Sequence, residues 1–333
     1  KSFGVKTFQA EDEIAGISAA LGASFVGKLA VTASSGPGIA LKGEAMGLAI
    51  MTELPIVIIN VQRGGPSTGL PTKTEQADLF QALYGRNSEA PCVVIAAQSP
   101  GDCFYAAYEA SRIALEHMIP VILLTDGYIA NGSEPFKIPN VKDLPEITPN
   151  WYSGNQESFN PYERDSKTLA RKWVIPGMKG LEHRIGGLEK ENITGNVSYE
   201  PDNHDLMVRL RQEKVDIISK TIPKIKPYGS KKGDLLILGW GGTFGAIRSA
   251  TRKALDEKLS VAHLHLKYLN PLNDELSEIL NNYDTVLIPE INLGQLNFII
   301  RSKFLIDTIS LNKVSGQPYT SSEIVDKIKE ILN

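Results

Sequence analysis

Cysteine is nearly absent from this 333-residue sequence, which contains only Cys92 and Cys103. Two thiols are too few for a disulfide scaffold, a four-cysteine iron–sulfur cluster or a cysteine-based structural zinc site. The five histidines also lack the spacing of metal ligands. We therefore expect no metal site and no cluster here, so any such centre would lie on another chain.

The sequence also has no excess of positive charge and no long apolar run. Lys and Arg number 35 against 38 Asp and Glu, so the formal net charge is -3 and no basic surplus predicts a nucleic-acid or anionic-membrane partner. No apolar stretch approaches the roughly 18 residues of a membrane span, and the residues after Lys1 do not resemble a signal peptide. We therefore expect a cytoplasmic protein without nucleic-acid or membrane partners.

Short apolar runs alternate with longer segments of helical period, which predicts an α/β fold class with parallel sheets covered by helices on both faces. In the first half, the predicted strands are 28–32, 55–61, 92–97 and 120–125, and the predicted helices are 11–23, 41–53 and 102–118. A short strand is also predicted at 5–9. A second block follows Gly233, with strands at 235–238, 261–266 and 285–289 and helices at 245–257, 274–282 and 321–332.

The composition changes between the two blocks and divides the chain into three parts. We predict a first α/β domain at 1–140, an irregular connecting segment at 141–230 with one amphipathic helix at about 205–222, and a second α/β domain at 231–333. The chain is long enough to bury two cores. An irregular segment of this length is functional, packed over a neighbouring surface, or mobile.

Ligands of open parallel sheets bind beyond the carboxyl ends of the strands, so the turns that follow the strands are informative. The turn at 32–38 offers the hydroxyls of Ser34 and Ser35, and Gly36 allows close approach to the backbone. A helix cap is the alternative interpretation of this turn. The turn at 62–69 carries Arg63, which can clamp a carboxylate through two hydrogen bonds unless it is only a surface residue.

Two later turns and an acidic cluster give weaker signals. The turn at 239–245 fails the dinucleotide fingerprint because Phe244 occupies the last glycine position, which disfavours a nicotinamide cofactor. Glu290 ends a predicted strand, and there we favour a structural or interface role. The acidic cluster at 11–13 opens a helix, where the helix dipole favours carboxylates, and one of them can still point into the crevice.

The turns together are similar to one enzyme family. The runs 9–15, 32–38 and 62–72 resemble the alpha subunit of 2-oxoacid:ferredoxin oxidoreductases, most closely the 2-oxoglutarate (2-oxoglutarate synthase) type. Shorter stretches at 173–180, 186–189, 238–241 and 290–296 fit as well, so the resemblance covers nearly the whole chain. It implies that the first domain is the pyrimidine-binding domain of a thiamine diphosphate enzyme and that the last is similar to a transketolase C-terminal domain.

The implied reaction is the oxidative decarboxylation of a 2-oxoacid with coenzyme A to acyl-CoA, CO2 and reduced ferredoxin. Glu11 matches the catalytic glutamate that hydrogen-bonds the aminopyrimidine ring of thiamine diphosphate and favours the tautomer that activates the cofactor. Arg63 matches the residue that holds the substrate carboxylate, and Thr68 would bind substrate beside it. The resemblance assigns further cofactor contacts to Ser34, Ser35 and Gly36.

The resemblance also implies other subunits. The family's Gly-Asp-Gly motif for the cofactor diphosphate and Mg²⁺ is missing, because Asp126-Gly127 follows Thr125. A beta subunit would therefore hold the diphosphate, Mg²⁺ and an iron–sulfur cluster, and this chain alone would be inactive. Relatives normally begin with a further Tyr-Pro-Ile-Thr-Pro strand and often carry a gamma domain, so we expect Lys1 to lie inside a larger polypeptide and the first sheet to lack a strand.

Three alternatives remain open at the level of sequence. One is a pyruvate or branched-chain 2-oxoacid enzyme, because a single Arg63 accounts only for the carboxylate that all 2-oxoacids share. Another is a non-catalytic assembly subunit that retains Glu11 and Arg63. The third, a nicotinamide dehydrogenase, is disfavoured by the glycine spacing.

Overall fold

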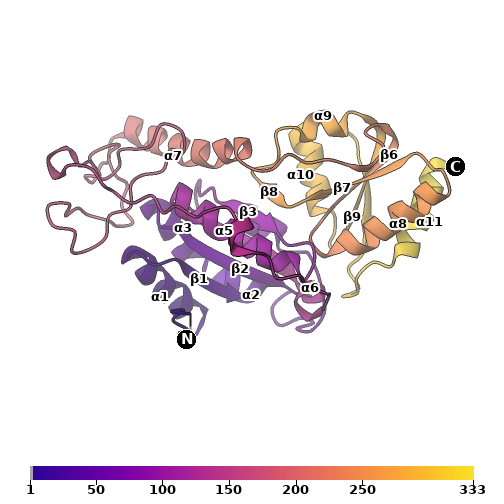
Figure 1. The fold of residues 1–333 in the computed structure, drawn as a ribbon, viewed down its shortest axis with the longest axis horizontal. Coiled ribbons are helices and arrows are strands. Elements are labelled where there is room, and N and C mark those ends of the chain that lie inside the picture. The colour runs from indigo at the N-terminus through magenta and orange to yellow at the C-terminus, as the bar shows by residue number, and fades with distance from the viewer. Residues whose placement is uncertain (1–2) are drawn as a thin grey trace.

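The computed structural model describes residues 3–333, and its strands form two sheets that lie along the long axis of the molecule (Figure 1). The first sheet has the order β1–β2–β4–β3–β8, with β1 (Ala30–Ser34), β2 (Ile56–Gln62), β3 (Val93–Ala96), β4 (Pro120–Asp126) and β8 (Tyr268–Asn270). All neighbours are parallel except β3 and β8. A short strand from the second half of the chain, which the sequence did not predict, thus completes the first sheet.

Helices cover both faces of the first sheet. One face carries α1 (Glu13–Phe25), α2 (Gly36–Leu41), α3 (Gly43–Thr52) and α4 (Leu79–Tyr84); the other carries α5 (Asp102–His117), and α6 (Gly127–Asn131) follows β4. Ile56 and Ile58 of β2 pack toward α1–α4, whereas Val57 packs toward α5, which is why these strands are continuous apolar runs. The predicted strands at 28–125 and helices at 11–118 are confirmed, with boundaries within two residues.

The second sheet has the order β10–β9–β6–β7–β5. Its strands are β5 (Tyr228–Gly229), β6 (Gly233–Trp240), β7 (Val261–Leu266), β9 (Tyr283–Glu290) and β10 (Ile309–Asn312). One face packs on α8 (Phe244–Asp256) and α11 (Ser321–Leu332), and the other on α9 (Leu276–Leu280) and α10 (Gln295–Phe304). The predicted helix at 274–282 is shorter than expected, and only Leu276 and Leu280 of its residues are buried.

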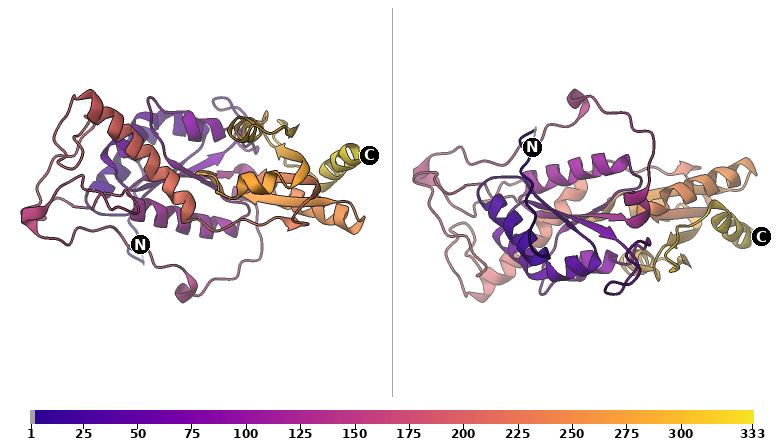
Figure 2. Two further views of the ribbon diagram at one scale, coloured as in Figure 1. Left: turned by 90° about the horizontal axis from the view of Figure 1, so that it is seen from above. Right: turned by 90° about the horizontal axis from the view of Figure 1, so that it is seen from below.

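Residues 132–200 form wide loops that extend away from the first sheet (Figure 2), interrupted by the 3-10 turns η1 (Val141–Asp143) and η2 (Gln156–Ser158). The chain then returns through α7 (Pro201–Asp216) and the 3-10 turn η3 (Ile217–Lys220). The helix predicted at about 205–222 is therefore wrong at both ends. The helix begins earlier than predicted because Pro201 suits the first helical turn, where no N–H is needed. It ends at Asp216, and the chain continues as the narrower 3-10 turn η3 before Pro223.

The strand predicted at 5–9 is also wrong. These residues are exposed and have no regular structure. A strand needs a neighbour for its backbone N–H and C=O groups, and no strand among residues 3–333 lies beside this segment. β1 is the edge strand of the first sheet, and Val31 at its centre is 50% exposed.

Turns at the ends of strands join the two sheets. The Asp126 carboxylate accepts a hydrogen bond from the Gly242 N–H at 3.0 Å, in the 3-10 turn η4 (Gly241–Thr243). The Gln76 amide donates to the Trp240 carbonyl at 2.8 Å. Glu290 is fully buried and accepts from the Trp240 indole at 3.2 Å and from two backbone N–H groups of α10. The structural role that we favoured for Glu290 agrees with this geometry.

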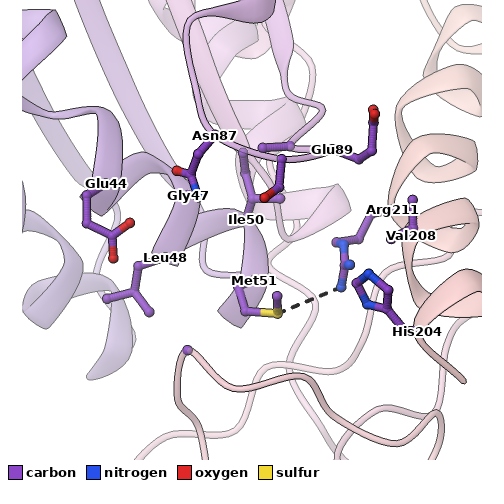
Figure 3. A pocket seen from close by; sticks show the side chains of 13 residues that line it. Glu44, Gly47, Leu48, Ile50, Met51, Asn87, Glu89, His204, Val208 and Arg211 are labelled. Carbon is purple, nitrogen blue, oxygen red and sulfur yellow. Dashed lines mark hydrogen bonds between the residues drawn. The ribbon is translucent and has the colours of Figure 1, made fainter. Parts of the chain in front are cut away.

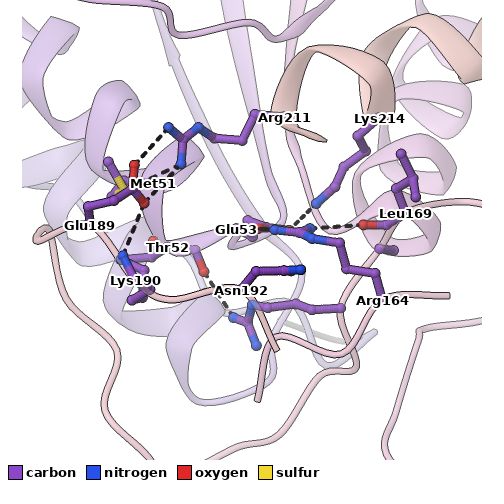
Figure 4. A network of polar contacts seen from close by, with 12 residues as sticks. Met51, Thr52, Glu53, Arg164, Leu169, Glu189, Lys190, Asn192, Arg211 and Lys214 are labelled. Carbon is purple, nitrogen blue, oxygen red and sulfur yellow. Dashed lines mark hydrogen bonds and ion pairs between the residues drawn. The ribbon is translucent and has the colours of Figure 1, made fainter. Parts of the chain in front are cut away.

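A buried ion cluster attaches the connecting segment and α7 to the end of α3 (Figure 4). Glu53 is 2% exposed and caps α3 with a left-handed backbone. Arg164 donates two hydrogen bonds to its carboxylate, at 2.5 and 2.8 Å, and Lys214 of α7 forms an ion pair with it. Burial alone would raise the pKa of Glu53, but Arg164 and Lys214 outweigh burial and hold this pKa well below its usual range.

We predict that Glu53→Gln lowers the free energy of unfolding at neutral pH by about 3–5 kcal/mol, because two buried cations lose their counter-ion. Since the folded-state pKa is depressed, the contribution of Glu53 is present above the unfolded pKa of about 4.3 and is lost as pH falls below it. Urea denaturation at several pH values measures both effects.

The matched control for this prediction is Asp205→Asn, which breaks an exposed ion pair with Arg209 on α7. Because water already screens that pair, stability should hardly change. A Glu53→Gln protein as stable as this control would contradict a structural role for the buried cluster.

Candidate functional site

The strand register brings the two glycine turns of the first half to one edge of the first sheet. Ser34 at the end of β1 pairs with Asn60 of β2, and Gln62 at the end of β2 pairs with Asp126 of β4. Arg63 directly follows Gln62. The turn after β1 and the turn after β2 therefore lie at the carboxyl edge of neighbouring parallel strands, where the sequence predicts the crevice.

The acidic cluster at the start of α1 divides into three different environments. Asp12 is the helix cap, and its carboxylate accepts the Ala15 N–H at 2.7 Å. Glu13 is half-buried, and its side chain lies against the Cα of Gly38. Glu11 is exposed, and its carboxylate has no hydrogen bond or ion pair with residues 3–333. The Glu13 carboxylate also has no hydrogen bond or ion pair within residues 3–333, so Glu11 differs from it by being exposed to a ligand.

The turn after β1 is closely packed around its glycines. A Cβ on Gly36 would lie 2.8 and 3.0 Å from the two carboxylate oxygens of Asp78. A Cβ on Gly38 would lie 2.0 Å from the Ser34 hydroxyl. Ser35 occupies the cap position of α2, but its hydroxyl makes no capping hydrogen bond. The helix-cap interpretation therefore does not account for the Ser35 side chain, which stays half-exposed.

Arg63 is half-buried and has no acidic partner. Its side chain makes no ion pair or hydrogen bond with residues 3–333, and its Nε is fully buried without an acceptor. A buried guanidinium N–H without an acceptor is costly, so this position suits an anionic ligand. Thr68 lies on an exposed loop that is closed by hydrogen bonds between Gly64 and both Leu70 and Lys73, each 2.9 Å long.

Sequence reasoning missed two acidic residues near this edge. Asp78 accepts a hydrogen bond from the Asn60 amide at 3.0 Å, and burial raises its pKa. Burial also raises the pKa of Glu75, which lies close to the Gly65 N–H at 3.4 Å. A buried Asn60 at the end of an apolar strand was the available signal, but the pairing with Asp78 depends on the fold. Asp78 thus contacts the end of β2, and Glu75 contacts the turn that carries Arg63.

Asp126 belongs to the structure rather than to this free edge. One carboxylate oxygen accepts the Tyr128 and Ile129 N–H groups at 2.9 and 3.0 Å and so caps α6, and it also accepts the Thr74 hydroxyl at 3.1 Å. The other oxygen holds Gly242 of the second sheet. Both carboxylate oxygens of Asp126 are therefore engaged within the chain.

A cavity of about 480 Å³ lies elsewhere, between α3, the loop before β3 and α7. Figure 3 shows Glu44 and Asn87 on one side, with Arg211 and His204 of α7 opposite. Arg211 is already paired with Glu189, at 3.1 and 3.3 Å. None of the residues predicted to bind substrate or cofactor lines this cavity.

Comparison with known families decides the assignment. Residues 2–201 match the family of pyruvate flavodoxin/ferredoxin oxidoreductases, thiamine diphosphate-binding. The chain belongs to this family. The resemblance drawn from the three motif runs and the predicted α/β fold class are thereby confirmed, and a thiamine-diphosphate-binding domain is present.

Individual relatives cover the whole chain. It is 57% identical over its full length to 2-oxoglutarate oxidoreductase subunit KorA of Mycobacterium tuberculosis, but spans 50% of that protein. It is 33% identical to 2-oxoglutarate synthase subunit KorA of Archaeoglobus fulgidus, covering 99% of this chain and 86% of that one. The chain thus spans about half of the first relative and most of the second.

Two solved structures resemble the fold. The 2-oxoglutarate:ferredoxin oxidoreductase from Magnetococcus marinus, with 2-oxoglutarate, coenzyme A and succinyl-CoA bound, aligns with a TM-score of 0.94 and 35% identity, over 100% of this chain and 58% of that chain. A split gene transketolase aligns with a TM-score of 0.50 at 14% identity, over 95% of this chain and 80% of the other, and shows the fold alone.

Membrane-spanning helices and clustered metal ligands are both absent from residues 3–333. No helix there is long and apolar enough to cross a membrane. No three His, Cys, Asp or Glu side chains of this part of the chain come together as a metal-ion site.

We predict that Gly38→Ala lowers the free energy of unfolding by about 1–3 kcal/mol, because the new methyl group overlaps the Ser34 hydroxyl and the Glu13 side chain. Chemical denaturation measures the change. Adding Ser34→Ala should recover part of the loss, since it removes the closest overlap.

Gly245→Ala is the control for this substitution. Gly245 lies in α8, and no atom lies within 4 Å of the position that an added methyl group would take. Alanine should therefore raise stability by about 0.5–1 kcal/mol through helix propensity. Equal effects at the two glycines would contradict the close packing of the turn.

Proposed function

We propose that this chain is the alpha-type catalytic part of a thiamine-diphosphate-dependent 2-oxoacid:ferredoxin oxidoreductase that converts 2-oxoglutarate, with coenzyme A, to succinyl-CoA, CO2 and reduced ferredoxin. The observation that carries the proposal is Arg63, a half-buried guanidinium without a counter-ion among residues 3–333, at the carboxyl edge of the thiamine-diphosphate-binding domain. The choice of 2-oxoglutarate rests on the two KorA relatives and on the Magnetococcus enzyme.

The residues at this edge fit the cofactor. The glycines at 36 and 38 leave no room for side chains and keep the turn after β1 close to the sheet, and Glu11 presents a free carboxylate at the start of α1. When bound, thiamine diphosphate supplies the nucleophilic carbon and the electron sink for decarboxylation. Glu11 would hold the ring nitrogen of the aminopyrimidine and share a proton with that atom. Ser34, Ser35 and Gly36 would line the same side of the ring.

Substrate would bind on the neighbouring turn. Arg63 would orient the 2-oxoacid by two hydrogen bonds to its carboxylate, and the exposed Thr68 would add a hydroxyl from the loop. Arg63 contributes no selectivity among 2-oxoacids, because all of them carry this carboxylate. A panel of 2-oxoglutarate, pyruvate and branched-chain 2-oxoacids therefore decides the substrate.

The remaining parts of the reaction would lie on other subunits or domains. Asp126 is committed to α6 and η4, so we place the diphosphate and Mg²⁺ on a beta subunit. Only two cysteines are present, Cys92 and Cys103, so we place the iron–sulfur cluster on the beta subunit too. Electrons would pass to ferredoxin, and a gamma domain or subunit would complete the enzyme in the cytoplasm. Within this chain, residues 1–140 and 231–333 would form the two α/β domains, and residues 141–230 would connect them.

We predict that Glu11→Gln lowers the turnover of the reconstituted enzyme by at least about 100-fold, because the amide cannot exchange a proton with the aminopyrimidine. The assay combines this chain, as part of its full polypeptide, with the beta subunit, thiamine diphosphate, Mg²⁺, coenzyme A and a ferredoxin or viologen acceptor. This chain without the beta subunit should show no turnover.

Glu163→Gln is the matched control, since Glu163 is exposed on the connecting segment and its carboxylate makes no hydrogen bond within residues 3–333. It should leave turnover unchanged. A loss of no more than twofold in Glu11→Gln would remove Glu11 from the catalytic site.

For Arg63→Ala we predict a KM for the 2-oxoacid that rises at least about tenfold, with little change in thiamine diphosphate affinity, because the lost contact is to the substrate carboxylate. Arg63→Lys should recover only part of the affinity, since an ammonium cannot make the same two parallel hydrogen bonds. Steady-state kinetics measure both variants against Arg209→Ala, an exposed arginine of α7. An unaltered KM in Arg63→Ala would exclude it from the substrate site.

A further inference from the structure

A fully buried lysine lies beneath the turn that follows β1. Lys42 joins α2 to α3 and is 1% exposed. Its ammonium donates to the Thr32 hydroxyl at 2.8 Å and lies 3.5 Å from the Ala33 carbonyl. Both acceptors belong to the last residues of β1, directly before Ser34. The charge therefore lies under the carboxyl edge, next to the residues that we assign to cofactor binding.

Lys42 differs from the other buried lysines in its partners. Lys214 forms an ion pair with Glu53, and Lys190 donates to two backbone carbonyls, each 2.6 Å away. Lys42 has no carboxylate within ion-pair distance among residues 3–333 and has only one short hydrogen bond. Lysine is rarely buried without a partner, because its charged form loses hydration. If position 42 only filled space in the core, a neutral side chain of similar size such as methionine would do so equally well.

Glu13 is the charged group that acts on Lys42. Burial lowers the pKa of Lys42, and the Glu13 carboxylate opposes this change. Glu13 comes from the first turn of α1, and its Cγ would lie 2.6 Å from a Cβ on Gly38, where the Ser34 hydroxyl would lie at 2.0 Å. Glu13 and Ser34 thus converge on the same glycine. The start of α1 and the turn after β1 are packed together above the Lys42 charge.

We propose that Lys42 is a positioning residue for the cofactor site, whose buried ammonium holds the end of β1 through Thr32 and keeps the Glu13 side chain against Gly38, so that Glu11 is held in place beside the turn at 34–36. The proposal rests on the proposed function in one respect, namely that thiamine diphosphate is the ligand of Glu11. Lys42 itself touches neither cofactor nor substrate. It acts through Thr32 and Glu13, which belong to the two segments that carry the cofactor contacts.

The test uses Lys42→Met, which keeps the side-chain volume and removes the charge, and Lys42→Arg, which keeps the charge. Lys28→Met, at an exposed lysine just before β1, is the control with the same change in net charge. Glu13→Gln removes the same electrostatic contact without altering the buried position and serves if Lys42→Met does not fold. All variants are made in the full polypeptide assembled with its beta subunit.

Two readouts separate positioning from simple stability. The first is thiamine diphosphate affinity at neutral pH, which Lys42→Met and Glu13→Gln should each weaken about tenfold. The second is amide hydrogen exchange without cofactor, which should rise at residues 13–17 and 32–38. Lys42→Arg should recover most of both effects, and Lys28→Met should show neither.

These measurements decide whether Lys42 positions the cofactor site. A folded Lys42→Met protein with affinity within twofold of the wild type, or with unchanged exchange in the two segments, would overturn the positioning role even if its melting temperature fell. If the wild-type complex itself did not bind thiamine diphosphate, the proposed function would fail. In that case the exchange measurement alone would decide whether Lys42 holds the two segments together.

Discussion

Backbone pairing of β1 with β2, and of β2 with β4, is the constraint on which the rest of the molecule depends. These strands are parallel and covered on both faces, so their carboxyl ends lie at one edge with Ser34 beside Asn60 and Gln62 beside Asp126. A shift in register would separate Arg63 from the turn after β1 and would move Asp126 away from Gly242. The carboxyl edge with its two glycine turns and the contact with the second sheet therefore depend on the same register.

The polar groups near the strand ends divide into those that are hydrogen-bonded within the chain and those that are not. Asp126 and Gln76 form hydrogen bonds that join the two sheets, whereas Glu290 holds α10 and Trp240 within the second half of the chain. The apolar core continues from one sheet to the other. Arg63 and Glu11 have no such partners among residues 3–333. A polar group near a crevice that has no hydrogen-bond partner within the fold is free to bind a ligand. The presence or absence of such a partner separates the structural residues from the proposed functional ones.

The buried charges at Glu53 and at Lys42 have different kinds of partners. In the cluster around Glu53, cations from the connecting segment and α7 meet a carboxylate at the end of α3, which fixes long loops that have little regular structure of their own. Under the turn after β1, the Lys42 ammonium has no ion-pair partner among residues 3–333 and donates instead to the Thr32 hydroxyl. The first arrangement attaches the connecting segment to the first domain, and the second holds the end of β1 at the carboxyl edge of the sheet.

The apolar runs predicted the central strands, and the motif runs predicted the family, because both depend on neighbours along the chain. Residues 5–9 and the boundaries of α7 were mispredicted for the converse reason, since a strand needs a partner and a helix end depends on its packing. The sequence by itself determined the parallel α/β pattern and the family's turns with Glu11 and Arg63. Only the tertiary structure decided that β8 completes the first sheet, that Asp78 packs on Gly36 and that Lys42 binds the end of β1 through Thr32. Contacts between residues distant in the chain arise only when the sheets and helices pack.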